Sequence, residues 1–380
     1  MSLPPKRSLG IAAAIAAGAL LLTGCGGMSE AASGSTAAAN SKCASTDTVK
    51  VVLQWVTQAQ FAGYYQAQEK GYYADNCLDV KIQEGGNNVS PQQVLASGNA
   101  DIAVTQALPS MASREAGSDL VDIGQVFQKG AFLQVSWADS GINSIKDLKG
   151  TKMGSWGSGN ETVLYAALRA NGVEPTTDVN VIQQPFDVSP LLKNDVQSIQ
   201  AKTYNEYAQL LETVNPKTGN LYQPSDFKVL NLNDFGYQTL EDAIYSRDSW
   251  LADPKHKDAA TRFLAASYNG WIDCRDNADS CVDTVLKNGS ALGKGHQTWM
   301  MNEVNKVIWP SDKGIGYLDP AVWDKAMQNG VDGKAIKALP QGGYRTDLND
   351  AALALLKKDG VDVTGASYKP LTVTPTAGGK

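Results

Sequence analysis

Short runs of β-branched and apolar residues alternate with longer amphipathic runs along most of the chain. This alternation is typical of a mostly parallel sheet with helices on both faces, because parallel strands are joined by a long crossover that is usually a helix. About 335 residues follow the low-complexity N-terminal segment, more than one hydrophobic core usually spans. The sequence therefore predicts an α/β fold with two lobes.

The order of the runs indicates where each lobe begins and ends. The first lobe is expected to comprise residues 46–138 and 243–367, and the second lobe residues 139–242. The expected strands cover residues 48–55, 78–82, 101–104, 120–126, 132–137, 152–155, 179–184, 196–201, 227–232 and 243–246. From residue 255 onward the chain is mainly helical, and we expect these helices to brace the first lobe. Residues 368–380 are rich in Pro, Thr and Gly, which predicts a disordered tail.

The N-terminus carries the features of a bacterial export signal. Lys6 and Arg7 precede an apolar run, residues 9–22, which leads into Thr23-Gly24-Cys25. With about 14 residues the run is shorter than the roughly 20 helical residues that cross a bilayer, so cleavage is favoured over a permanent membrane helix. A small residue before a cysteine at this place resembles a lipobox, which implies that Cys25 is modified with diacylglycerol. An ordinary signal peptide beside a free cysteine is the alternative.

The mature chain is then expected to start with a lipid anchor at Cys25 and a flexible tether. Residues 1–24 would be removed as the signal peptide, and residues 25–45 offer too little bulky apolar surface to fold. These features predict a protein on the extracytoplasmic face of the cell membrane, in a periplasm or on the outer surface of a Gram-positive cell. The net charge of -6 gives no indication of a nucleic-acid partner.

The cysteine count indicates a disulfide framework. Setting Cys25 aside leaves an even number of cysteines, which in an exported protein favours two disulfides. We expect Cys43 to pair with Cys77, and Cys274 with Cys281. In one straight helix Cys274 and Cys281 would lie about 10 Å apart, beyond the roughly 7 Å limit for a bridge, so the chain must turn between them. Buried free cysteines are the alternative.

The segment from Trp55 to Tyr73, with its run Gln-Ala-Gln-Phe-Ala-Gly-Tyr-Tyr, resembles the opening of a known family. This is the periplasmic-binding-protein family that includes sulfonate, nitrate, riboflavin and thiamine-pyrimidine-precursor binders. Residues 77–80, 94–101 and 145–150 add further resemblances, the last reading Ile-Lys-Asp-Leu-Lys-Gly. The resemblance implies the type II periplasmic-binding-protein fold with ligand in a cleft between the lobes. It also implies a monomer that is not an enzyme, and the permease of an ABC importer as its partner.

Loops at the carboxyl ends of parallel strands converge where two lobes face each other, so ligand-binding residues are expected just after strands. In the first lobe these positions hold Trp55, Gln58, Gln60, Phe61, Tyr64, Glu84, Asn87 and Gln106. In the second lobe they hold Trp156, Asn160, Glu161, Tyr204, Asn205, Glu206, Asp234 and Tyr237. Of Tyr64 and Tyr65, one is expected to face the cleft and the other the core.

The candidate positions combine aromatic rings with amides and carboxylates, and they include no Arg or Lys. Aromatic rings can sandwich a flat heterocycle while polar groups bind its edge, whereas a sulfonate or nitrate site needs basic donors. This chemistry predicts a small aromatic heterocycle as the ligand, riboflavin or a thiamine pyrimidine precursor. A sulfonate or nitrate receptor is the alternative within the family, and some of the aromatic residues could equally belong to the core.

An exported enzyme of the same fold is the alternative from another class. The family also contains pyrimidine synthases, and in them a histidine stands where this chain has Phe61. The cysteine-rich iron-site motif and the active-site lysine of those synthases are not located in this sequence. Both histidines, His256 and His296, are expected to lie on the surface. The usual spacings of metal ligands are not found, so neither a metal nor a cofactor is expected.

Overall fold

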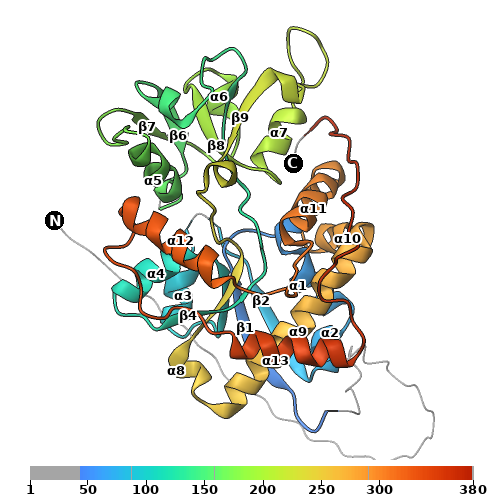
Figure 1. Cartoon of the computed structure of the whole chain (residues 1–380). Coiled ribbons are helices and arrows are strands. Elements are labelled where there is room, and N and C mark those ends of the chain that lie inside the picture. The colour runs from blue at the N-terminus through green and yellow to red at the C-terminus, as the bar shows by residue number, and fades with distance from the viewer. Residues whose placement is uncertain (1–42, 87, 158, 290, 379–380) are drawn as a thin grey trace, which may run out of the picture. The chain divides into compact units, whose positions relative to one another are not determined.

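The structure, a computed structural model, describes residues 43–86, 88–157, 159–289 and 291–378. The expected signal peptide, the lipidation site Cys25, almost all of the expected tether and the candidate residue Asn87 lie outside the described residues. The described chain forms two five-stranded sheets, each covered by helices (Figure 1). Two α/β lobes are therefore present, as the sequence predicts.

The first sheet has the strand order β2-β1-β3-β10-β4. Its strands are β1 (Asp47–Leu53), β2 (Leu78–Gln83), β3 (Ile102–Thr105), β4 (Leu120–Gln125) and β10 (Ala243–Arg247). β1 runs parallel to β2 and β3, whereas β10 runs antiparallel to β3 and β4. Successive side chains of β1 point to opposite faces, so Val51 and Leu53 join one core and Val52 joins the other. Both faces of this sheet are buried, which explains why β1 is mostly apolar.

The second sheet has the strand order β7-β6-β8-β5-β9. Its strands are β5 (Phe132–Trp137), β6 (Lys152–Ser155), β7 (Asn180–Gln183), β8 (Ser198–Lys202) and β9 (Phe227–Asn231). β5 is antiparallel to both of its neighbours, β8 and β9. The sequence-based boundary after residue 138 is therefore corrected: the chain already crosses between the lobes after β4, and β5 satisfies its backbone groups inside the second sheet.

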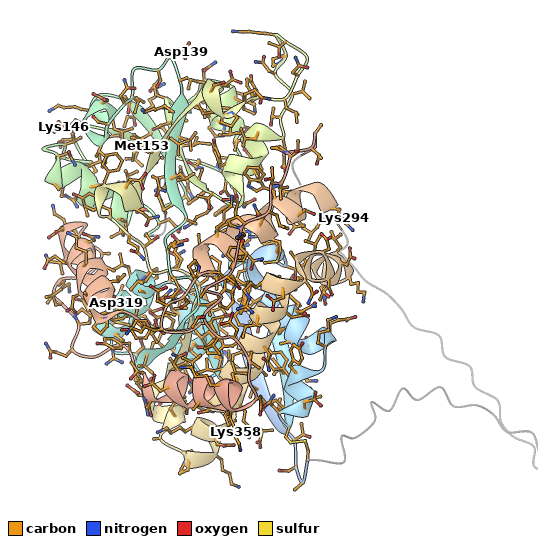
Figure 2. The ribbon with its side chains drawn as sticks, turned by 45° about the vertical axis from the view of Figure 1, so that its right-hand side comes forward. Asp139, Lys146, Met153, Lys294, Asp319 and Lys358 are labelled. Atoms are coloured by element: carbon orange, nitrogen blue, oxygen red, sulfur yellow. A yellow bond between two sulfur atoms is a disulfide. The ribbon has the colours of Figure 1, made fainter. Side chains whose placement is uncertain are left out.

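Helices cover both sheets, and most of them belong to the first lobe (Figure 1). They are α1 (Ala62–Glu69), α2 (Tyr72–Asp75), α3 (Pro91–Ala96), α4 (Ala107–Glu115), α5 (Thr162–Ala170), α6 (Ser189–Leu192), α7 (Glu206–Leu211), α8 (Asp248–Leu251), α9 (Pro254–Asp276), α10 (Ala278–Asn288), α11 (Lys294–Ile308), α12 (Pro320–Asp332) and α13 (Asp347–Lys358). Asp253 caps α9 and Asp319 caps α12, and a proline follows each cap at the first helical position. Asp139 and Lys358, labelled in Figure 2, mark the far ends of the second and first lobes.

The long helix α9 packs closely on α1 because both helices carry a glycine at the contact. A Cβ atom on Gly270 would lie 2.0 Å from the backbone oxygen of Gly63. A Cβ atom on Gly63 would lie 2.2 Å from the ring of Trp271. This close approach fixes how α1 is rotated, and thereby which of its side chains face the core.

The C-terminal segment is ordered against other elements over its described residues. Figure 1 shows this segment rising past α10 and α11 to the neighbourhood of α7. The backbone N–H of Leu371 donates to Asn302 Oδ1 at 2.9 Å, and the N–H of Gly378 donates to the Glu212 carbonyl at 3.3 Å. The expectation of a disordered tail is therefore corrected for residues 368–378, because side-chain and backbone acceptors hold a segment that has little apolar surface of its own.

Both expected disulfides are present. Cys43 and Cys77 are joined with their Cα atoms 5.6 Å apart, and Cys274 and Cys281 with their Cα atoms 5.4 Å apart. The chain turns between Cys274 and Cys281 as predicted, since α9 ends at Asp276 and α10 begins at Ala278.

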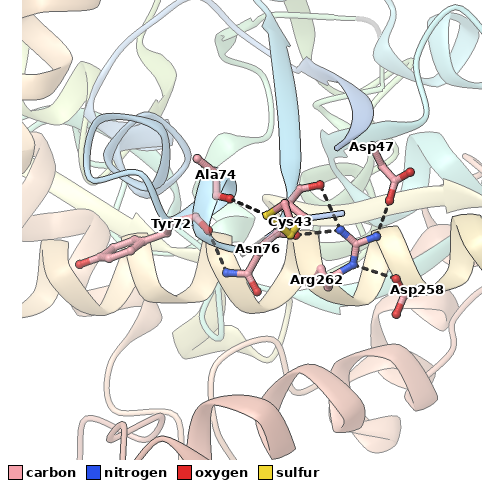
Figure 3. The surroundings of a disulfide bond; sticks show 8 residues. Cys43, Asp47, Tyr72, Ala74, Asn76, Asp258 and Arg262 are labelled. Carbon is pink, nitrogen blue, oxygen red and sulfur yellow. Dashed lines mark hydrogen bonds and ion pairs between the residues drawn. A yellow bond between two sulfur atoms is a disulfide. The ribbon is translucent and has the colours of Figure 1, made fainter. Parts of the chain in front are cut away.

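The first disulfide lies beside a half-buried arginine, Arg262, that fastens the start of β1 (Figure 3). Arg262 of α9 donates to the backbone oxygens of Asn76 at 2.7 Å and Cys77 at 3.3 Å, and it pairs with Asp47 and Asp258. The chain that follows the expected tether is thus fixed to the first lobe at its first described residue.

Within the residues that the structure describes, none of the helices combines the length and the apolar character needed to cross a bilayer.

Candidate ligand-binding site

A cavity of about 410 Å³ lies between the two lobes. It opens at the carboxyl ends of β1, β3, β6 and β8 and at the N-termini of α3 and α4. This is the place that the sequence predicts for a ligand, because strand ends from both lobes converge there. The lobes also touch on either side of the cavity, through α12 against α5 and through α11 against α7.

The structure brings nine of the sixteen candidate residues together around the cavity. They are Trp55, Gln58, Gln60, Gln106, Trp156, Asn160, Tyr204, Asn205 and Glu206. Asn87 lies outside the described residues. The remaining six, Phe61, Tyr64, Glu84, Glu161, Asp234 and Tyr237, do not line this cavity.

Two of the first-lobe candidates, Phe61 and Tyr64, do not reach the cavity because of the way α1 is rotated. Phe61 and Tyr64 are fully buried in the core beneath α9, where the Tyr64 ring stacks on Phe263 with centroids 6.4 Å apart. Tyr65 does not face the cavity either, since its hydroxyl lies 2.7 Å from Thr57 Oγ1. The expectation that one of the two tyrosines faces the cleft is therefore wrong.

The other four described candidates that do not line the cavity lie elsewhere in the two lobes. Glu84 accepts hydrogen bonds from the backbone and the hydroxyl of Thr57. Glu161 stands at the start of α5, Asp234 is exposed on the turn after β9, and the Tyr237 ring packs against the core of the second lobe.

Sequence reasoning missed several lining residues. Those with the clearest chemistry are Gln54, Phe186 and Lys202, and Asn88 to Gln93 add the loop before α3 and its first turn. Lys202 directly follows the expected strand 196–201, and Phe186 follows the expected strand 179–184. The rule that site residues follow strands would have found both.

Three aromatic side chains from both lobes form one wall of the cavity. Phe186 stacks on Trp156 with an interplanar angle of 7° and a centroid distance of 6.2 Å. The same ring contacts Trp55 of the first lobe at 4.3 Å between centroids. Trp156 is buried, and its indole Nε1 has no hydrogen-bond partner among the described residues. This wall therefore offers flat apolar faces to the cavity.

Lys202 corrects the expectation that no basic residue reaches the site. Its Nζ lies 2.6 Å from Glu241 Oε2 and 4.8 Å from the centroid of the Phe132 ring. Both partners of the ion pair are buried, and Glu241 belongs to the segment that returns to the first lobe. The positive charge in the cavity is thus already neutralised by a carboxylate.

Two further buried carboxyl groups surround this ion pair. Glu206 accepts from the backbone N–H of Lys202 and from Asn205 Nδ2, both at 3.0 Å, and burial raises its pKa. Asp242 accepts from Gln60 Nε2 at 2.8 and 3.1 Å. Burial, and next the charge of Glu241, raise the pKa of Asp242 to about 7.

The raised pKa of Asp242 makes stability depend on pH. A carboxyl whose pKa is higher in the folded state contributes stability at low pH that is lost as the pH rises from its ordinary value of 3.8 toward 7. D242N removes this titration, and asparagine also tolerates the left-handed backbone at this position, where φ is 50°. We expect the free energy of unfolding of D242N to fall less steeply than that of the wild type between about pH 4 and pH 7.

Urea unfolding followed by circular dichroism across this pH range checks the expectation. D139N, a change at an exposed carboxyl, is the control. Parallel curves for D242N and the wild type would contradict the titration of Asp242.

The two histidines differ from the sequence-based expectation. His256 is half-buried, with its ring stacked on Trp250 at 4.6 Å. His296 is only 5% exposed, so the expectation of a surface residue is wrong. Among the described residues, no group of three His, Cys, Asp or Glu side chains is placed to hold a metal ion.

Comparison with known proteins relates this architecture to a family. A family model described as NMT1/THI5 like matches residues 58–280, which is more than half of the chain. The chain belongs to this family.

NMT1/THI5-like relatives carry several names. Riboflavin-binding protein RibY from Chloroflexus aurantiacus is 23% identical over 323 residues, which cover 81% of this chain and 88% of that protein. Formylaminopyrimidine-binding protein from Halalkalibacterium halodurans is 24% identical over 246 residues, 64% of this chain and 71% of that protein. Other relatives are named 4-amino-5-hydroxymethyl-2-methylpyrimidine phosphate synthase. A relative from Haemophilus influenzae whose name refers to thiamine biosynthesis is 28% identical over 155 residues, 40% of this chain, and the chain spans only about half, 49%, of its length.

Solved structures relate this NMT1/THI5-like chain to periplasmic binding proteins. The periplasmic aliphatic sulphonate binding protein SsuA from Escherichia coli matches with a TM-score of 0.60 and 17% identity, covering 81% of this chain and 97% of that chain. At this level of identity the likeness shows the fold, which is the two-lobe fold predicted from the sequence.

Proposed function

We propose that this protein is the extracytoplasmic solute-binding component of an ABC importer and that it captures a small planar heterocycle, riboflavin or a thiamine pyrimidine precursor. The observation that carries the proposal is the aromatic wall of Trp55, Phe186 and Trp156, which faces amide and carboxyl groups across an interlobe cavity. The names of the riboflavin-binding and formylaminopyrimidine-binding relatives support this class of ligand.

The size and lining of the cavity suit such a ligand. Its volume of about 410 Å³ lies within the range of roughly 300 to 1,000 Å³ that is usual for small-molecule sites. Flat rings prefer offset stacking on aromatic side chains, which Trp55 and Phe186 provide at the mouth. Amide side chains such as Gln58, Gln106 and Asn160 supply both donors and acceptors for the edge of a heterocycle.

The charge of the cavity argues against an anionic ligand. Lys202 is the only lysine or arginine among the described lining residues, and Glu241 already pairs with it. A sulfonate or nitrate would also have to lie near Glu206 and Asp242. Since such anions are bound by unpaired basic donors, the sulfonate or nitrate alternative is disfavoured.

The remaining parts of the proposal concern delivery of the ligand. Cys25 would anchor the protein to the outer face of the membrane, and residues 26–45 would act as a flexible tether between this anchor and the two lobes. A monomer would close around the ligand and present both lobes to the permease. The enzyme alternative requires turnover of the ligand, and the synthase names among the relatives make that test necessary.

Calorimetry with riboflavin, hydroxymethylpyrimidine, taurine and nitrate tests the proposal. We expect one of the two heterocycles to bind and to raise the melting temperature, with the ligand recovered unchanged by mass spectrometry. Binding of taurine or nitrate alone would overturn the ligand class. Chemical conversion of the bound heterocycle would overturn the receptor function.

W55A is expected to weaken binding of the heterocycle by about 1 to 3 kcal/mol, because it removes one face of the stacking wall. Trp156 is buried against Phe132, so W156F is the matched change there; it keeps an aromatic ring in the wall, and we expect it to weaken binding less than W55A does. W250A alters a tryptophan outside the cavity and serves as the control. Calorimetric titration measures all three variants, and unchanged affinity in W55A would contradict the stacking model.

A further inference from the structure

His296 belongs to the first lobe but makes its hydrogen bonds in the second. It lies in the first turn of α11, and its Nδ1 is 2.8 Å from Glu212 Oε2, at the end of α7. Its Nε2 is 3.0 Å from Oδ1 of Asn205, which lines the cavity. The imidazole thus joins the lobes beside the candidate ligand site.

The hydrogen-bond pattern fixes the role of the ring nitrogen Nε2. Asn205 Nδ2 donates to Glu206 Oε1, so its Oδ1 must be the atom that faces the histidine. Asn205 Oδ1 is an acceptor, so Nε2 carries the proton that is donated to it, and Nδ1 makes the second hydrogen bond with the Glu212 carboxyl group. The Glu212 side chain is fully buried, and His296 is the partner that satisfies its Oε2.

We propose that His296 is a positioning residue that orients Asn205 and Glu206 in the cavity and ties this orientation to the contact between the lobes. The expected effect on ligand affinity rests on the proposed function. The chain of contacts from Glu212 through His296 and Asn205 to Glu206 does not depend on that function.

Neighbouring contacts hold α11 at the place this role requires. Trp299 Nε1, one turn after His296, donates to the backbone oxygen of Thr203 in the second lobe at 3.1 Å. The described part of the C-terminal segment runs along the same helix, and the N–H of Gly378 donates to the Glu212 carbonyl at 3.3 Å. Figure 1 shows this segment passing α11 on its way to α7. Glu212 therefore receives contacts from α11 and from the C-terminal segment at once.

Nuclear magnetic resonance tests the contact without any ligand. The chain has two histidines, so H256Q in untagged protein with ¹⁵N-labelled histidine leaves the His296 ring alone in the spectrum. We expect a ring N–H signal from Nε2 that exchanges slowly with water. A ring that shows no protected N–H signal would overturn the proposal, whatever the ligand turns out to be.

Two conservative variants separate positioning from mere stability. The amide of glutamine reaches about as far as Nε2, and that of asparagine about as far as Nδ1. H296Q therefore keeps the donor to Asn205, and H296N keeps a hydrogen-bond partner for Glu212. Riboflavin and hydroxymethylpyrimidine serve as probes. For the probe that binds, we expect H296A to lower the affinity about tenfold, which is the magnitude expected for the loss of one hydrogen bond to a polar group. H296Q should retain more affinity than H296N, and H256A should match the wild type.

The outcomes of the two experiments are distinguishable. Equal affinity of H296Q and H296N, or an H296A protein that binds like the wild type, would overturn the positioning role. If the wild type binds neither probe, the ligand class of the proposed function fails, and the ring N–H signal still decides whether His296 joins the lobes.

Discussion

K202M is expected to lower the free energy of unfolding by about 3 to 5 kcal/mol, because it leaves Glu241 charged and without its cation in the interior. Glu241 is 1% exposed, and its other oxygen accepts from the backbone N–H of Ala131 in the first crossover. The ion pair therefore ties β8 to both segments that connect the lobes. Its loss should also abolish measurable binding of the heterocycle, since the cavity wall beside Glu206 would carry uncompensated negative charge.

A double variant separates the charge from the packing. K202M/E241Q removes both charges and should recover a large part of the lost stability, because a buried ion pair replaced as a whole costs less than one that is broken. K152M, on an exposed lysine of β6 in the same sheet, is the control and should change the free energy of unfolding by less than about 0.5 kcal/mol. Urea unfolding measures all three variants. A K202M protein as stable as K152M would show that the pair carries no structural role.

C43S/C77S is expected to lower the free energy of unfolding by about 4 kcal/mol, because the bond closes a loop with a sequence separation of 34 residues in the unfolded chain. C274S/C281S, whose separation is 7 residues, should cost about 2 kcal/mol by the same loop-closure argument. Arg262 keeps its bonds to Asp47 and to the Cys77 carbonyl, so β1 should stay paired when the first bond is removed (Figure 3).

Urea unfolding of the two double variants tests this order. Intact-mass analysis of the wild type without reductant should first show the loss of four hydrogens for the two bonds. A larger loss in C274S/C281S than in C43S/C77S would contradict the loop-closure argument. Ligand affinity should remain unchanged in both variants, since neither disulfide lines the cavity.

The strands could be predicted closely because their signal is local. β6 and β9 begin at the expected residues, and β2 differs by one residue at its end. The lobe to which a strand belongs cannot be predicted from the residues of that strand alone. β5 reads like any other apolar strand, and its place in the second sheet depends on pairing with β8 and β9, which lie more than 60 residues further along the chain.

The candidate site could be predicted to the extent that it follows strand ends. Trp55, Trp156 and Tyr204 were found in this way, and Lys202 and Phe186 could have been found by the same rule. The side chains of α1 were misplaced because a helix presents several faces, and the packing of α9 against it decides which face is buried.

By itself the sequence determined the alternation of strands and helices, both disulfide pairs, and the convergence of polar and aromatic residues behind the strands, since each of these follows from composition and spacing along the chain. Only the tertiary structure decided that β5 belongs to the second sheet, that Lys202 is neutralised by Glu241, and that His296 is buried between the lobes. Each of these depends on segments far apart in the sequence meeting in space, and on the charges and acceptors that then face one another.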